Sequence, residues 1–179
     1  MTCMVKYVLS AALLLSSATS ALVAADKPAG LDQTGQPDIK TAGPLAFGPS
    51  GVLFVGDPQG AALFALEVPQ TKAESAQPFK LEGIDAKVAA LLGTKAADIL
   101  INDLAIQPGT NLAYLSVSRG KGPTAEPAIV TITTKGDVAL LPLEKVNFAK
   151  VAISNAPSPE AKDRRGGSLR QESITDLAL

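Results

Sequence analysis

Few residues of this chain have the types and spacing that chemistry at neutral pH requires. The 179-residue sequence contains no histidine, which removes the usual general base, a common zinc ligand and any Ser-His catalytic pair. Its one cysteine, Cys3, lies at the N-terminus. Glu67, Glu82 and Glu172 are scattered, so no carboxylate pair is predicted for acid/base catalysis. The sequence therefore indicates no catalytic residue.

The sequence has two short basic stretches, of which the first could meet an anion. Arg119 and Lys121 lie in the glycine-containing segment SRGKGP, and Arg164 and Arg165 lie in a Gly/Ser-rich segment. SRGKGP lacks the following helix and the Lys-Ser/Thr pair of a phosphate loop, so both stretches are predicted to be solvated loops. The alternative for the second is a protease-sensitive or partner-facing site. With 16 Lys and Arg against 17 Asp and Glu and only 4% aromatic residues, the chain is not expected to bind nucleic acid.

The first 25 residues predict a secretory signal peptide. Lys6 supplies the positive charge, residues 7–24 form an uncharged and mostly apolar segment, and residues 23–25 are the small residues that signal peptidase requires. The alternative is an uncleaved membrane anchor, but the segment is barely long enough to span and several Ser and Thr residues dilute it. We expect an exported protein, periplasmic or extracellular, with no stable membrane span after cleavage.

The elements that must position any site begin after a predicted linker at residues 26–41, which leaves room for one strand near its end. Apolar runs separated by Gly- and Pro-containing turns predict four short strands, at residues 45–47, 52–55, 61–68 and 78–82. Asp57 starts the turn DPQG, where an Asx turn accounts for it. Together these strands would form a small antiparallel meander.

A helical insertion separates this unit from a second copy of it. Val88, Leu91 and Leu92 have helical spacing within residues 85–98, and Gly93 interrupts the pattern. The following stretch LAIQPGTNLAYLSVS, residues 104–118, then repeats LAFGPSGVLFVGD. The expected strands of this second unit are at residues 104–106, 112–117, 127–133 and 138–143.

A third copy starts near the end of the sequence. Residues 176–179 repeat residues 103–106, and Ile174 matches Ile101. Residues 144–172 between the second and third copies contain prolines and a Gly/Ser-rich stretch and are expected to be a loop.

The segment LAFGPSGVLFVGDPQGAALFAL, residues 45–66, resembles the repeats of NHL and related six- or seven-bladed β-propellers, including the SMP-30/gluconolactonase kind. Asp57 occupies the Asp position of that motif, and Ser118 stands there in the second copy. The resemblance implies an all-β fold, a β-propeller with about two four-stranded blades, the start of a third and a short helical insertion. Because two blades cannot close a ring, we expect a longer protein or, less favoured, assembly of several copies.

In these terms the chain divides into a signal peptide (1–25), a linker (26–41) and a partial propeller domain (42–179). Within the domain we expect blade 1 at about 42–83, the helical insertion at 85–98, blade 2 at about 101–143, the loop at 144–172 and the start of blade 3 at 173–179.

The same resemblance implies where a ligand would lie. In such propellers the first strand of each blade lines the central channel, and the residues at its entrance face ligands; here these are Asn102, Asp103, Thr175 and Asp176. Asp103 and Asp176 would then be ligands of Ca²⁺ or another divalent metal. The first copy has glycine and proline there, without a ligand side chain. The alternative is that both carboxylates accept backbone hydrogen bonds and tie the blades together.

Two functions remain open. The first is a binding or scaffold protein that recognises a small molecule, peptide or polymer through the face and channel of the propeller. The second is a metal-dependent lactonase or esterase-type hydrolase of the SMP-30/gluconolactonase kind, so enzyme activity is left open. A quinone-cofactor dehydrogenase is disfavoured because those propellers carry Trp-rich motifs and this chain has no Trp.

Overall fold

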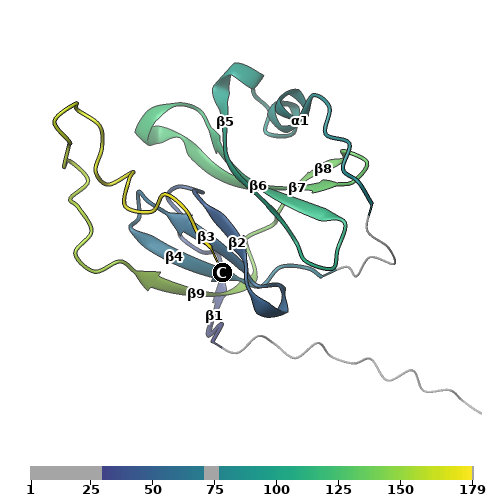
Figure 1. Cartoon of the computed structure of the whole chain (residues 1–179), viewed down its shortest axis with the longest axis horizontal. Coiled ribbons are helices and arrows are strands. Elements are labelled where there is room, and N and C mark those ends of the chain that lie inside the picture. The colour runs from purple at the N-terminus through teal and green to yellow at the C-terminus, as the bar shows by residue number, and fades with distance from the viewer. Residues whose placement is uncertain (1–29, 71–76, 179) are drawn as a thin grey trace, which may run out of the picture.

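The computed structural model describes residues 30–70 and 77–178, which form two stacked antiparallel sheets and one helix (Figure 1). Sheet A has the strand order β1-β9-β4-β3-β2, and sheet B has the order β5-β6-β7-β8. The strands of sheet A are β1 (Gln33–Gly35), β2 (Leu45–Phe47), β3 (Leu53–Asp57), β4 (Ala62–Leu66) and β9 (Val146–Ala152). Those of sheet B are β5 (Ile99–Ile106), β6 (Leu112–Arg119), β7 (Glu126–Thr133) and β8 (Val138–Leu140).

The hydrophobic core lies between the two sheets. Alternate side chains of β4 are fully buried, as the two-residue period of a strand requires when one face meets a core. From sheet A come Leu53, Val55, Phe64 and Leu66, and they pack with Tyr114 and Ile129 of sheet B. The ring of Phe47 on β2 meets the ring of Tyr114 edge-on, with centroids 5.1 Å apart.

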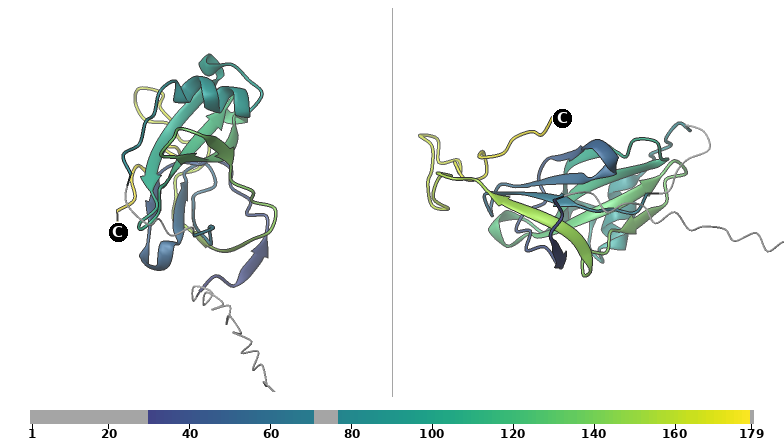
Figure 2. Two further views of the ribbon diagram at one scale, coloured as in Figure 1. Left: turned by 90° about the vertical axis from the view of Figure 1, so that its right-hand side faces the viewer. Right: turned by 90° about the horizontal axis from the view of Figure 1, so that it is seen from below.

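The helix α1 (Ile84–Leu91) covers the other face of sheet B, where the side chains of Val88 and Ala89 are buried (Figure 2). The helix ends at Leu91, and Gly93 two residues later has a φ of +66°. The N–H of Gly93 donates to the carbonyl of Ala90, and that of Thr94 donates to Ala89, which is the hydrogen-bond pattern of a Schellman motif. The predicted helical insertion is confirmed, and a short 3-10 turn (Ala96–Asp98) leads from it into β5.

The prediction of a fourth strand at residues 78–82 is wrong. This segment is irregular and mostly exposed, and β9 pairs with β4 instead, with Phe148 opposite Leu66. Phe148 is buried in the core, a contact that the exposed segment at 78–82 does not make. The stretch 144–172, expected to be a loop, therefore contains a strand, and sheet B is inserted between the third and fourth strands of one four-stranded unit. The predicted linker contains a short strand, β1, which also pairs with β9.

The expected first strand of a third blade is not a strand in the structure. Residues 173–178 are irregular and return along sheet A after the long loop that follows β9 (Figure 2). The Ser173 hydroxyl donates to the carbonyl of Pro58 at 3.5 Å, and a Cβ added at Gly56 would lie 3.0 Å from Ile174. The two sheets do not close into a ring.

The register of sheet B also corrects one assignment in the repeat. On β2 and β3, Leu45 is opposite Val55, and on β5 and β6 the matching Leu104 is opposite Leu115. Asp57 lies two residues after Val55, and Val117 lies two residues after Leu115. Val117, and not Ser118, is therefore the counterpart of Asp57 in the second copy. The turn before β6 is only one residue longer than its counterpart, so the second copy is displaced by one position and not two.

The predicted signal peptide and the first residues of the linker lie outside the described residues. In the part of the chain that the structure describes, no helix is long and apolar enough to cross a membrane.

Candidate functional site

Asn102 and Asp103 on β5 connect the inner edges of the two sheets. One carboxylate oxygen of Asp103 accepts the backbone N–H of Leu45 at 2.8 Å, and the other accepts that of Leu104 at 2.7 Å. The amide of Asn102 donates to the carbonyl of Ala42 at 2.7 Å and to the Ser118 hydroxyl at 2.9 Å. A β-bulge lies between Ile101 and Asp103, and such an irregularity re-aims side chains at a sheet edge. These hydrogen bonds give Asp103 the sheet-joining role that was the alternative to metal binding.

Thr175 and Asp176 are exposed on the C-terminal segment. One carboxylate oxygen of Asp176 accepts the N–H of Leu177 at 2.8 Å, which repeats the local contact of Asp103 with Leu104. Across residues 30–70 and 77–178, no three His, Cys, Asp or Glu side chains gather at one point. Ca²⁺ requires six to eight oxygen ligands, so the described residues do not fit the divalent metal that the resemblance implies.

Asp57 is the most deeply buried carboxylate among the core residues, and it holds chain segments together. Its oxygens accept backbone N–H groups from Lys40 at 2.8 Å, Thr41 at 2.9 Å and Gly60 at 2.8 Å. The bond to Gly60 is the Asx turn expected from the sequence. The two others fasten the segment before β2 to the β3–β4 turn, which nothing in the sequence spacing could have indicated.

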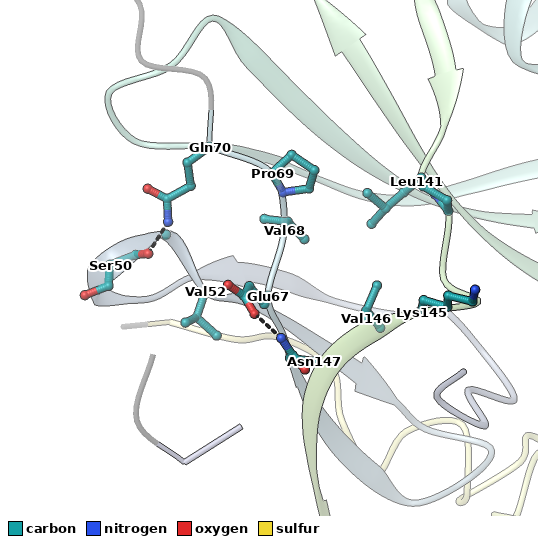
Figure 3. A pocket seen from close by; sticks show the side chains of 12 residues that line it. Ser50, Val52, Glu67, Val68, Pro69, Gln70, Leu141, Lys145, Val146 and Asn147 are labelled. Atoms are coloured by element: carbon teal, nitrogen blue, oxygen red, sulfur yellow. Dashed lines mark hydrogen bonds between the residues drawn. The ribbon is translucent and has the colours of Figure 1, made fainter. Parts of the chain in front are cut away.

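A groove of about 580 Å³ lies at the end of the sheets where β2 turns into β3 (Figure 3). Two pairs of its polar groups are hydrogen-bonded to each other, and Lys145 is its remaining charged residue. The Asn147 amide donates to Glu67 at 2.6 Å, and the Gln70 amide donates to the Ser50 carbonyl. The remaining wall is formed by core residues such as Val68 and Leu141. This groove offers no converging set of polar groups to a ligand.

A larger cleft of about 840 Å³ lies at the opposite end, and we call it the basic cleft. It is bounded by the segment before β2, the β3–β4 turn, the start of β5, the end of β6 with the loop that follows it, and the long loop after β9. Its cationic residues are Lys121, Lys162 and Arg170, its neutral polar residues include Thr41, Gln59, Asn102, Ser118, Ser168 and Gln171, and its apolar residues are Ile99, Leu100, Ala125 and Pro159. Of the four predicted ligand-contacting residues, Asn102 alone lines it.

A small hairpin in the long loop positions two of these residues. Lys162 and Ser168 form an antiparallel bridge, and the N–H of Leu169 donates to the carbonyl of Ala161 at 3.0 Å. One carboxylate oxygen of Asp163 accepts the N–H groups of Arg165 at 2.8 Å and Gly167 at 2.7 Å, which closes the hairpin tip. Arg165 therefore stands at the tip, and Lys162 stands at the cleft.

The two basic stretches of the sequence have different roles in the structure. The guanidinium of Arg119 pairs with Glu126 at 2.8 Å across the β6–β7 hairpin, and both side chains are largely exposed. Lys121 lines the basic cleft instead. Spacing could not separate these two cations, and it could not connect Lys121 with Lys162 and Arg170, because the long loop after β9 brings them together.

Comparison with protein-family models, with curated proteins and with solved structures finds no match for this chain.

Proposed function

We propose that this chain is an exported binding protein of the β-propeller type, which recognises its ligand in the basic cleft. The observation that carries the proposal is the cleft itself. Five separate segments of the chain converge on it, and its volume of about 840 Å³ is in the range of sites for small molecules.

The arrangement of the sheets supports the propeller part of the proposal. The two four-stranded units are stacked face to face, and their first strands, β2 and β5, lie beside each other with Asp103 joining them. In propellers such first strands surround the central channel. Further sheets of the same kind, in the same chain or from other copies, would complete the ring.

Binding is favoured over metal-dependent hydrolysis by the state of the predicted metal ligands. Both oxygens of Asp103 accept backbone hydrogen bonds, and a metal at this carboxylate would compete with the contact to Leu45. The basic cleft contains lysine and arginine side chains, which repel a divalent cation.

A fragment screen by amide NMR tests the proposal. Small molecules that bind should shift the backbone amide signals of Gly120 and Gly122 in the cleft wall, leave those of the groove near Ser50 unchanged, and be recovered without chemical change. Binding confined to other surfaces would contradict the proposal. Turnover of lactone or ester substrates that chelator abolishes would establish the hydrolase instead.

The predicted export is tested by the mass of the protein that an expressing cell secretes. Retention of residues 1–25 would contradict cleavage of the signal peptide.

A further inference from the structure

The basic cleft has one sign of charge in a chain that is nearly neutral as a whole. The formal net charge of the chain is −1, yet the cleft contains Lys121, Lys162 and Arg170 and, among the described residues, no carboxylate. Six carboxylates are sequence neighbours of the lining: Asp103 and Asp163 accept backbone hydrogen bonds, Glu126 pairs with Arg119, Asp98 is half-buried, and Glu160 and Glu172 are exposed. In the described part of the chain none of the three cations forms an ion pair, whereas Lys40 and Arg119 elsewhere do. A concave site of one sign concentrates ions of the opposite sign.

Arg170 provides a second and independent observation. Its side-chain Nε atom is buried and has no hydrogen-bond partner among the described residues. A buried charged donor without an acceptor is costly, and such groups in native proteins are normally satisfied by protein, water or ligand. Because Nε is shielded from solvent, a bound anion would meet the guanidinium through its outer nitrogens, which belong to the side chain that lines the cleft.

Neutral groups of the cleft complete the set of donors and add an apolar wall. The Ser118 oxygen accepts from Asn102 at 2.9 Å, which leaves its own O–H available to donate. Leu100 lines the same cleft and is 61% exposed, an unusual position for a leucine side chain at a polar site. Ile99 and Pro159 extend the apolar wall.

We propose that the basic cleft binds a small organic anion, with its carboxylate or phosphate group at Arg170, Lys162 and Lys121 and an apolar stem against Leu100. This inference rests on the proposed binding function and specifies its ligand class. Arginine and lysine both bind carboxylate and phosphate oxygens, and arginine does so through paired N–H donors.

Calorimetric titration of the full chain with matched probes tests the inference. Hexanoate and hexyl phosphate carry the proposed group on a six-carbon stem, and hexanol and hexylamine carry the same stem without an anion. We expect both anions to bind, with affinity that falls as salt is added, and neither control to bind. The anion that binds more tightly distinguishes a carboxylate ligand from a phosphate ligand. Equal binding of hexanol would overturn the inference.

Substitutions locate the binding. Arg170→Gln should weaken binding of the preferred anion about tenfold, the expected loss for a charge-assisted hydrogen bond. Arg164→Gln is the matched control, because Arg164 is exposed in the same loop but does not line the cleft, and it should leave affinity unchanged. Since Arg170 is partly buried, Lys162→Gln is the second variant: Lys162 is exposed, and its loss should weaken binding about threefold.

The outcomes separate this inference from the proposed function. Equal weakening by Arg164→Gln would show a nonspecific charge effect and overturn the inference. If neutral fragments shift the amides of Gly120 and Gly122 but no anion binds, the anion assignment fails and the binding function stands. If nothing binds in the cleft, both fail.

Discussion

The Asp103 carboxylate on β5 accepts the backbone N–H of Leu45 on β2 at 2.8 Å, so a side chain of one sheet is bonded to the edge of the other. An N–H on an edge strand would otherwise be an unpaired donor. Asp103 thus fixes how the two first strands lie beside each other, and with them the wall of the basic cleft that Asn102 provides.

Replacing Asp103 by alanine should lower the free energy of unfolding by about 1 to 2 kcal/mol, because two backbone donors lose their charged acceptor. Asp176→Ala is the matched control, since among the described residues its carboxylate accepts a hydrogen bond only from the N–H of Leu177, and it should change stability by less than about 0.5 kcal/mol. Urea denaturation of both variants measures this. A Ca²⁺-dependent rise in the melting temperature that Asp103→Ala abolishes would favour the metal-site alternative.

Asp57 should matter more than Asp103, because it is fully buried and accepts three backbone N–H groups. Asp57→Ala should cost about 3 kcal/mol or more. Gly60→Ala should also destabilise, since its Cβ would lie 2.2 Å from an Asp57 oxygen. Asp137→Ala, in an exposed turn, serves as the control in the same denaturation series. A stable Asp57→Ala protein would contradict this account of the turn.

The place of β9 in sheet A can be tested by a pair of substitutions on that strand. Phe148 is 7% exposed and Val151 is 65% exposed. Phe148→Ala should therefore lower stability by about 3 kcal/mol, whereas Val151→Ala should be nearly neutral. Equal effects would show that β9 does not occupy its position in the core.

Burial raises the pKa of the Tyr114 hydroxyl above its usual value. The unfolded chain therefore ionises first as the pH rises, so stability should be constant well below about pH 10 and fall above it. Tyrosinate absorbance should show Tyr114 titrating later than a free tyrosine, and the late phase should disappear in Tyr114→Phe. A single transition at the ordinary pKa would contradict the buried position of this ring.

Local patterns predicted much of the fold. The strands β2, β3 and β4, the helix and the strands of sheet B follow from alternating apolar runs and Gly/Pro turns. The position of β9 could not be predicted from such patterns. Phe148 pairs with Leu66, although the helix and all strands of sheet B lie between these two residues in the sequence. A pattern read along the chain assigns the nearest apolar run, at residues 78–82, to that place.

The site was harder to predict than the strands. Asn102 was expected at the site and lines the basic cleft, but Lys162 and Arg170 come from a loop in which no spacing marks them as partners of Lys121. The pairing of Arg119 with Glu126 depends on the register of β6 and β7, which place the two residues opposite each other. Only the three-dimensional arrangement distinguishes the paired cation from the unpaired one.

A crystal structure of the full chain with hexyl phosphate tests the central claim most directly. We predict that the phosphate lies in the basic cleft, with an oxygen within hydrogen-bond distance of Arg170 and the six-carbon stem on Leu100. A phosphate bound at Arg164 or elsewhere on the surface, away from the Arg170 guanidinium, would contradict it.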